Sequence, residues 1–235
     1  MNILITGGSS GLGKNVVEIL SHKEKHKIFF TYNKNDNAAI ALKERSNNVI
    51  PIKLNFCDEN DIKSFLNEIP MMDLDVLINN AYVGALSPTH FHKIEAVDFL
   101  NSFQENIIPT IQITQKAIIT FKKKRFGKII NILTDYISNP PIGYSTYVSN
   151  KAYLLELSKV WNKEYTHYNI TSNCVSPSYM STKFSQFDER FMEHLKQQHP
   201  LKKLLTTYEA AEVIAFLTES SQQLNGMNIT LNGGK

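Results

Sequence analysis

Short, almost continuously apolar runs recur along the chain, separated by longer stretches with a different spacing. The runs are rich in isoleucine, leucine and valine, a composition typical of β-strands. Strands without a polar alternation are buried on both faces of a sheet. We therefore predict seven strands, which cover residues 2–6, 27–32, 49–55, 74–80, 128–133, 170–176 and 227–234.

The stretches between these runs carry apolar residues at helical spacing. Val16, Val17 and Leu20 share one face of a helix, and residues 62–69 follow the same period. Strands that alternate with helices of this length are joined by right-handed crossovers into a parallel sheet. The pattern predicts an α/β fold, with a doubly wound parallel sheet covered by helices on both faces.

Length and composition favour one domain. The chain has 235 residues, of which 42% are hydrophobic, enough for one substantial core over residues 1–235. No linker of biased composition interrupts it, and no internal repeat is visible. The apolar run after Met1 is short for a signal peptide, and no run is long enough to span a bilayer. We expect a soluble, cytoplasmic protein without a membrane partner.

Charge and cysteine content narrow the possible partners. The net charge of +3 is too small a bias to indicate nucleic-acid binding. We interpret the one dense basic run, residues 122–128, as a solvated turn between two elements. Cys57 and Cys174 are far apart and lack the spacing of a metal or redox motif. We expect both thiols to be buried, with no disulfide and no metal site.

The first predicted strand leads into a glycine-rich loop, Thr6 to Gly13, and then into a helix. Glycines allow a tight turn and let backbone N–H groups approach a pyrophosphate at the positive end of the helix dipole. A purely structural turn is the competing interpretation, but the flanking strand and helix are those a nucleotide loop requires. We predict cofactor contacts from Gly7, Ser9, Ser10, Gly11, Leu12 and Gly13.

The end of the second predicted strand indicates which dinucleotide binds. An NAD site often has an acidic residue there for the ribose 2′-hydroxyl, but this chain has Asn33 and Lys34 and no acid before Asp36. Lys34 and Asn33 could instead bind a 2′-phosphate. We predict NADPH in preference to NADH; the alternative is that Lys34 points into solvent.

Tyr147 and Lys151 are four residues apart, so on a helix they share one face. A nearby ammonium, helped by an oxidised nicotinamide, favours the phenolate and lowers the tyrosine pKa toward the working range. Tyr144 would lie on the preceding loop and Tyr153 on another helical face. The competing interpretation of Tyr147 is an ordinary half-buried aromatic residue.

Two further polar residues stand where they could assist this pair. Thr134 follows the fifth predicted strand, where its hydroxyl could share a carbonyl oxygen with Tyr147. Asn106 precedes Pro109 within a predicted helix. Because proline removes a backbone donor, the helix there could bend and the asparagine amide could hold a water.

In their order and spacing these motifs resemble the short-chain dehydrogenase/reductase family, from Asn2 to Gly234. The loop at residues 6–13 resembles its TGxxxGxG motif, residues 79–81 its NNAG motif, and residues 147–151 its YxxxK motif. Residues 173–182 resemble its NxxxPG segment, and residues 224–234 its closing strand. The resemblance implies a Rossmann-like fold and an NAD(P)-dependent oxidoreductase.

The resemblance also implies a role for each matching residue. Tyr147 would be the general acid, Thr134 would polarise the substrate carbonyl, and Asn106 would hold a water for proton supply. Lys151 would lower the tyrosine pKa and contact the nicotinamide ribose. Further cofactor contacts would come from Asn55, Phe56, Asn79, Ala81, Tyr147, Lys151, Pro177, Met180 and Thr182.

Three positions depart from the family pattern. Thr134 replaces serine, which keeps the hydroxyl on a stiffer side chain. Tyr82 and Ser178 each replace a glycine. Tyr82 could crowd the cofactor or line the substrate pocket, and Ser178 could alter the backbone beside the nicotinamide.

Within the family the chain is most similar to 3-oxoacyl-acyl-carrier-protein reductases, which act in fatty acid or polyketide biosynthesis. Arg125 falls where those enzymes dock the acidic carrier protein, although Tyr168 occupies the place of a second basic residue. Two alternatives stay open. One is a family member acting on a free small molecule such as a sugar, alcohol, steroid or diketone; the other is a non-catalytic dinucleotide-binding sensor.

Two expectations concern the outer parts of the molecule. The long connection around residues 178–207 predicts a substrate lid, with an excursion of no function as the alternative. The resemblance implies a homotetramer or homodimer that associates through helices at residues 106–124 and 147–165 and through the C-terminal strand.

Overall fold

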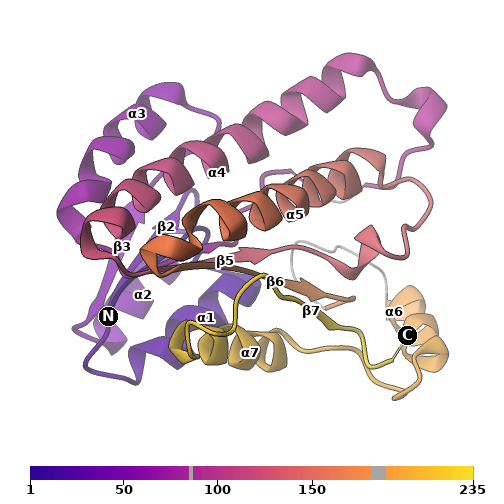
Figure 1. The fold of residues 1–235 in the computed structure, drawn as a ribbon. Coiled ribbons are helices and arrows are strands. Elements are labelled where there is room, and N and C mark those ends of the chain that lie inside the picture. The colour runs from indigo at the N-terminus through magenta and orange to yellow at the C-terminus, as the bar shows by residue number, and fades with distance from the viewer. Residues whose placement is uncertain (85–86, 181–188, 235) are drawn as a thin grey trace.

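The computed structural model describes residues 1–84, 87–180 and 189–234. Its centre is one parallel seven-stranded sheet in the order β3-β2-β1-β4-β5-β6-β7 (Figure 1). All seven predicted strands are confirmed: β1 Asn2–Ile5, β2 Lys27–Tyr32, β3 Val49–Lys53, β4 Val76–Asn79, β5 Gly127–Ile132, β6 Ile170–Pro177 and β7 Asn228–Leu231. The order reverses between β1 and β4, and such a switch point leaves a crevice at the carboxyl ends of the strands.

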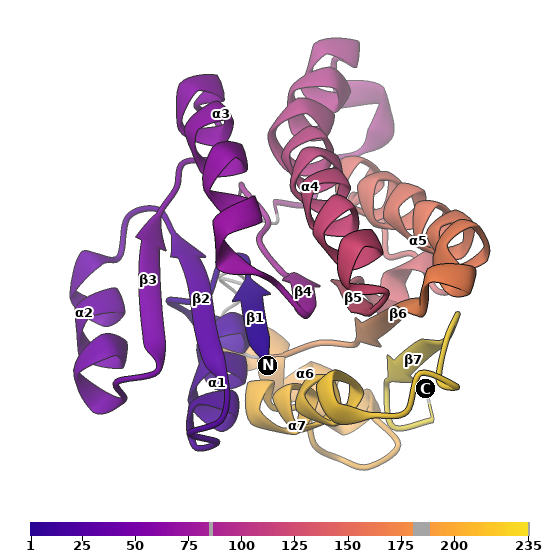
Figure 2. The same ribbon diagram turned by 60° about the vertical axis from the view of Figure 1, so that its left-hand side comes forward.

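Helices cover both faces of the sheet, as predicted (Figure 2). One face packs against α1 (Gly11–Ser21), α2 (Asp36–Arg45) and α7 (Thr207–Glu219). The other packs against α3 (Glu59–Glu68), α4 (Ala96–Lys124) and α5 (Ser145–Tyr165). The remaining helix, α6 (Glu189–Gln198), lies beyond the carboxyl ends of the strands in Figure 1.

Successive side chains of a strand point to opposite faces of the sheet, so each strand packs against both layers of helices. In β1, Ile3 and Ile5 pack under α1 and α7, whereas Leu4 packs under α3 and α4. All three are fully buried, which explains why the strand reads as a continuous apolar run. The sheet is thus held rigidly from both sides, and loops at its carboxyl edge can be positioned accurately.

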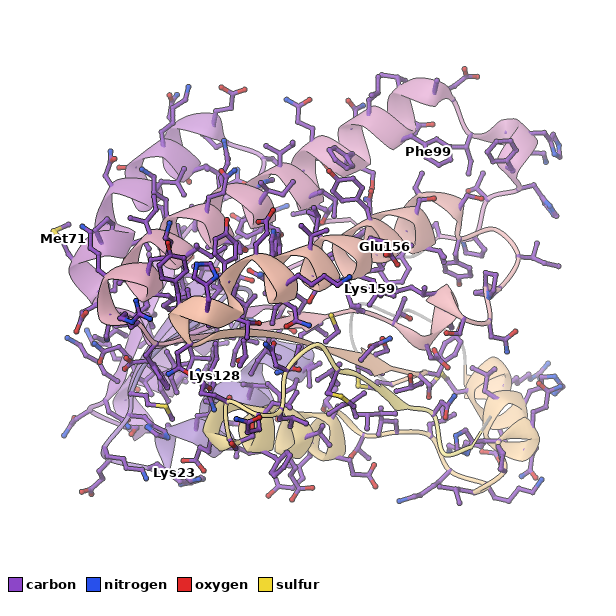
Figure 3. All side chains as sticks on the ribbon, viewed as in Figure 1. Lys23, Met71, Phe99, Lys128, Glu156 and Lys159 are labelled. Carbon is purple, nitrogen blue, oxygen red and sulfur yellow. The ribbon has the colours of Figure 1, made fainter. Side chains whose placement is uncertain are left out.

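The basic run at residues 122–128 corrects one prediction. Its first three lysines end α4, and Arg125 caps that helix in a left-handed conformation with φ of 50°. Lys128, however, is only 4% exposed and donates to the carbonyl oxygens of Thr218 and Ser220 at the end of α7. In Figure 3 it lies between the sheet and α7. The run is therefore not wholly solvated, because its last residue caps a distant helix.

The cysteine expectation is wrong for one of the two residues. Cys174 is buried in β6, but Cys57 is exposed. Cys57 lies on the connection between β3 and α3, where the chain leaves the core. Within the described residues, no helix is both long and apolar enough to cross a membrane.

Candidate active site

A cavity of about 500 Å³ opens at the carboxyl ends of the central strands. Its walls come from the loops after β1, β2, β3, β4 and β5, from the start of α5 and from the end of β6. These loops meet there because parallel strands end at the same edge of the sheet. The cavity brings together predicted residues from distant parts of the sequence: Gly7, Ser9, Ser10, Gly11, Leu12, Gly13, Asn33, Lys34, Phe56, Ala81, Thr134, Tyr147, Lys151, Pro177 and Met180.

The glycine-rich loop lines the cavity beside the start of α1. Gly7 has φ of 70°, a conformation that side chains disfavour. A Cβ atom on Gly13 would lie 2.2 Å from the carbonyl oxygen of Gly7, so this position admits no side chain without a shift of the loop. The loop therefore approaches the helix N-terminus closely enough to present backbone N–H groups to a pyrophosphate.

Asn80, which the sequence analysis missed, holds this loop in place. Its amide nitrogen donates to the carbonyl oxygens of Thr6 at 2.9 Å and Gly7 at 3.0 Å, and it lines the cavity. The predicted neighbour, Asn79, does not line the cavity. Asn79 is buried and donates to Thr114 and Asn131 under α4. The alternation of side chains along a strand could have distinguished the two residues.

At the far end of the cavity, Asn33 and Lys34 line the wall after β2. Asn55 does not line it; its side-chain oxygen accepts a hydrogen bond from Asn33 at 3.1 Å and so orients that amide. Asp36, the nearest acid after β2, is also outside the cavity lining. Its carboxylate pairs with Lys53 at 3.0 Å, an interaction that lowers the pKa of Asp36.

Tyr147 and Lys151 lie one turn apart on α5 and both line the cavity. Lys151 is 5% exposed, and its ammonium donates to the carbonyl oxygen of Ile132 at 2.7 Å. The same nitrogen lies 5.9 Å from the ring centroid of Tyr147. The helical spacing thus places cation and phenol side by side at the end of β5.

The pKa values of this pair are set mainly by burial. Burial lowers the pKa of Lys151 to about 8. Burial also raises the pKa of Tyr147, and a hydrogen bond from Thr134 opposes that rise. The protein's own groups therefore raise the tyrosine pKa on balance, and its lowering by Lys151 together with an oxidised nicotinamide stays a prediction. The cost of placing a phenolate in a dry site exceeds the benefit of the adjacent cation.

Thr134 stands at the carboxyl end of β5 with its hydroxyl directed at the pair. The backbone is extended there, and the Thr134 oxygen accepts a hydrogen bond from the backbone N–H of Tyr136 at 3.3 Å. The Thr134 hydroxyl also forms a side-chain hydrogen bond with Tyr147, which acts to lower the pKa of that tyrosine. A carbonyl oxygen entering the cavity can meet both hydroxyl groups.

Asn106 lies in α4, three residues before Pro109, but it does not line the cavity. Its side-chain oxygen accepts from the backbone N–H of Val83 at 2.6 Å, and its nitrogen donates to the carbonyls of Val83 and Ser102. These bonds fix the loop after β4 to α4. The structure therefore gives the Asn106 side chain a partner other than the predicted water.

The two glycine replacements leave the backbone undistorted. Neither Tyr82 nor Ser178 has a positive φ, so neither position requires glycine for its conformation. Both line the cavity, and the backbone N–H of Ser178 donates to Leu231 at 3.0 Å, which continues the pairing of β6 with β7. The expected alteration of the backbone at Ser178 is therefore not seen.

Aromatic rings gather at the side of the cavity nearest to Thr134. Tyr136 and Tyr179 line it with ring centroids 5.6 Å apart, and Tyr144, at the N-cap of α5, lies 5.7 Å from Tyr136. Sequence reasoning missed Tyr136 and Tyr179, since Tyr136 lies outside the motifs and Tyr179, within residues 173–182, is not one of the residues that define its motif. Tyr153 does not line the cavity, as expected from its place on another face of α5, and its side chain is partly exposed.

The described part of the predicted lid flanks this wall. Residues 178–180 line the cavity, and α6 follows after a segment outside the described residues. Met180 forms an isolated parallel bridge with Leu205, which returns the chain to the cavity before α7. The predicted cofactor residue Thr182 lies outside the described residues.

A parallel sheet with a glycine loop at its switch point and a tyrosine–lysine pair at the end of β5 defines a dinucleotide-dependent oxidoreductase. The short chain dehydrogenase family matches residues 1–192, and the chain belongs to that family. This confirms the family, fold and enzyme class predicted from the sequence.

Individual proteins extend the match beyond residue 192. The chain is 27% identical to the 3-oxoacyl-acyl-carrier-protein reductase FabG of Aquifex aeolicus, over 98% of this chain and 95% of that protein. It is 28% identical to the enzyme of the same name from Thermotoga maritima, over 98% and 96%.

Two solved structures have the same fold. One is a short chain dehydrogenase from Burkholderia cenocepacia in complex with NADP, with a TM-score of 0.86 and 21% identity over 99% of this chain and 96% of that one. The other is YwfH, an NADPH-dependent reductase involved in bacilysin biosynthesis, with a TM-score of 0.88 and 24% identity over the same shares.

Proposed function

We propose that this protein uses NADPH to reduce a ketone to a secondary alcohol. The observation that carries the proposal is the convergence of Tyr147, Lys151 and Thr134 at one end of a cavity whose other end has a glycine cradle. Two hydroxyl groups and a cation beside a nucleotide site suit the delivery of a proton to a carbonyl oxygen.

The residues at the cradle fit a dinucleotide. The pyrophosphate would lie on the loop at residues 7–13, where a Cβ on Gly13 would close the space against Gly7. Phe56 and Asn33 would flank the adenosine, and the segment 177–180 would flank the nicotinamide. When bound, NADPH supplies the hydride.

The choice of NADPH rests on the charges near the end of β2. Lys34 lines the cavity and Asp36 does not; Asp36 is engaged with Lys53. A 2′-phosphate would therefore meet a cation and an amide, with the nearest carboxylate already neutralised. The Burkholderia and YwfH structures, named for NADP and NADPH, support the same choice.

The protein's groups act together on the substrate. Tyr147 would give its proton to the carbonyl oxygen as the hydride arrives, while Thr134 donates a hydrogen bond to the same oxygen. The high pKa that burial gives Tyr147 keeps the phenol protonated and ready to act as an acid. Lys151 would bind the ribose and stabilise the phenolate left after transfer.

The leading substrate is a 3-oxoacyl thioester, since the two relatives above carry the name of 3-oxoacyl-acyl-carrier-protein reductase. Arg125 would then serve as a docking residue for the acidic carrier protein. It is exposed, and its guanidinium donates to the carbonyl of His167 and lies 5.9 Å from the ring of Tyr168.

The position of Arg125 also favours a second candidate, a free small ketone. Arg125 precedes β5, whereas Thr134 follows it, so the two residues lie at opposite ends of that strand. The six residues of β5 separate these two ends by roughly 20 Å. Within one chain, a carrier protein docked at Arg125 would sit far from the cavity mouth, and a free substrate needs no such contact.

The deciding experiment is spectroscopic measurement of NADPH oxidation with an acetoacetyl thioester, free and carrier-bound, beside a diketone and a keto sugar. Turnover of any ketone supports the reductase, and a carrier-bound preference that Arg125→Glu removes supports the first substrate. Lys123→Glu, an equal charge change two residues earlier, is the control. Tyr147→Phe should bind NADPH but not turn over; equal turnover by that variant would refute the assigned acid.

The absence of turnover with every ketone, together with tight NADPH binding, would instead favour the non-catalytic sensor. The site argues for catalysis because both Tyr147 and Lys151 are present and adjacent. The fold alone would not show that the protein is catalytic.

Self-association as a homodimer or homotetramer is part of the proposal. The outer surfaces of α4 and α5 expose a set of apolar side chains: Val97, Leu100, Ile108, Ile119, Tyr153 and Val160. The two helices pack together on one face of the molecule (Figure 1). Phe216 of α7 and Met227 before β7 are also exposed, as a second interface would require. Light scattering after size exclusion tests this directly.

A further inference from the structure

Tyr82 stands in the turn after β4 and touches both members of the tyrosine–lysine pair. Its ring centroid lies 5.0 Å from that of Tyr147, with the planes at 80° in an edge-to-face arrangement. The ammonium nitrogen of Lys151 lies 5.1 Å from the Tyr82 ring, closer than to the ring of Tyr147. The side chain that replaces the family's glycine is therefore in contact with the site's acid and its cation.

The far end of the same side chain is tethered to two helices. Asn150 of α5 donates to the Tyr82 hydroxyl at 3.4 Å and to the Ser102 hydroxyl of α4 at 2.9 Å. The hydroxyl groups of Tyr82 and Ser102 are themselves 3.4 Å apart. Asn150 is buried and precedes Lys151 in the chain, so this polar cluster fixes the ring beside the lysine.

We propose that Tyr82 is a positioning residue that holds Lys151 charged and Tyr147 oriented. The inference rests on the proposed function of the site. A buried ammonium needs compensating partners, and the structure gives Lys151 the Ile132 carbonyl and two aromatic rings. Within the described ranges, no salt bridge includes Lys151. The electron-rich face of a desolvated ring is a recognised partner for such a cation.

The other titratable groups around the cluster act on its two tyrosines. Asp135, in the short 3₁₀ helix Asp135–Ile137, acts electrostatically on Tyr147, and Glu105 of α4 acts on Tyr82. For Lys151 itself, burial is the one cause that shifts its pKa, to about 8. Under the proposal, the face of the Tyr82 ring near the ammonium opposes the tendency of burial to neutralise the lysine.

Two substitutions separate the ring from the hydroxyl. Tyr82→Leu removes the ring and keeps an apolar side chain, whereas Tyr82→Phe keeps the ring and removes the tether. On the alkaline side of the pH profile, kcat/KM of Tyr82→Leu should begin to fall at a pH about one unit lower than in the wild type. The reason is that loss of the ring favours the neutral form of Lys151. Tyr82→Phe should leave that pH unchanged, with kcat reduced by less than about threefold. Tyr208→Leu, which changes an exposed tyrosine of α7 outside the cavity lining, is the control.

A readout without turnover tests the same inference. With ε-¹³C-labelled lysine, NMR titration of Lys151, assigned by its loss in Lys151→Met, should show a lower pKa in Tyr82→Leu than in the wild type and Tyr82→Phe. Because this measurement needs no substrate, it decides the role of Tyr82 even if no ketone is reduced.

Three results would overturn the role. The first is an unchanged Lys151 titration in Tyr82→Leu, and the second is an equal effect of the Leu and Phe variants. The third is tighter NADPH binding and faster turnover in Tyr82→Leu, which would mean that the ring merely crowds the cofactor. If Tyr82→Leu does not fold, Tyr82→Met takes its place, since any apolar side chain without a ring should lower the Lys151 pKa in the same way.

Discussion

The side chain of Asn106 holds the backbone of Val83 from both sides, accepting from its N–H at 2.6 Å and donating to its C=O at 3.3 Å. The Asn106 amide thus forms the same two hydrogen bonds with Val83 that a residue of a neighbouring β-strand would form. It connects the middle of α4 to the loop that carries Tyr82 into the cavity. An amide that satisfies both backbone groups at once can be replaced by few other residues.

We predict that Asn106→Leu lowers the free energy of unfolding by about 2–4 kcal/mol, because two backbone groups of Val83 lose their partner. NADPH should bind more weakly in the same variant, since the loop after β4 loses its anchor. Urea unfolding and NADPH fluorescence measure the two effects. A normal stability with a selective loss of kcat would point instead to the water-holding role expected from the family.

Gly13→Ala should weaken nucleotide binding by closing the cradle. The added Cβ would lie 2.2 Å from the Gly7 carbonyl oxygen and 2.6 Å from the amide nitrogen of Asn80, so the loop must move. We expect NADPH affinity to fall by more than about tenfold, with a loss of stability of about 1–3 kcal/mol. Lys14→Ala, one residue further along α1, is the control and should bind normally. Titration calorimetry that shows equal affinities would contradict the proposed cradle.

Lys34→Glu should change which cofactor is preferred. If Lys34 meets a 2′-phosphate, the variant replaces an attraction by a repulsion, and the preference for NADPH over NADH should fall by about ten- to a hundredfold. Lys43→Glu makes the same change of net charge on the exposed surface of α2, away from the cavity, and should leave the ratio unaltered. Steady-state kinetics with both cofactors would show the difference, and a parallel loss for NADH would argue against recognition of the phosphate.

The sheet could be predicted in full because its strands are buried on both faces and so read as apolar runs. The pairing of Tyr147 with Lys151 was also predictable, since helical geometry alone places residues four apart on one face. Local periodicity determines both features. Neither depends on which distant segments pack together.

The missed features depend on packing between distant segments. Lys128 belongs to a basic run in sequence, yet it caps α7, ninety residues away by its bond to Thr218. Asn80, not Asn79, faces the cavity because β4 ends there and the side chains alternate. The tyrosine pKa also required coordinates, because burial rather than the neighbouring cation decides its direction.

The buried ammonium of Lys151 should make the stability of the protein depend on pH. Its pKa is about 8 in the folded protein, below the ordinary value of 10.5, because burial disfavours the charged form. Between these two values the folded state binds fewer protons than the unfolded state, so stability rises with pH. Below about pH 8 the lysine is charged in both states and contributes no slope.

The comparison that isolates this effect is the wild type against Lys151→Met, which keeps an apolar stem of similar length and has no charge. From about pH 8 to about pH 9.5, the wild type should gain about 1.5 kcal/mol of unfolding free energy relative to the variant. Urea unfolding at several pH values measures this difference. The other titrating groups are the same in both proteins, so their contributions to the unfolding free energy cancel. A difference that stays constant over this range would mean that Lys151 keeps an ordinary pKa, and the buried cation on which the proposed chemistry depends would have to be reconsidered.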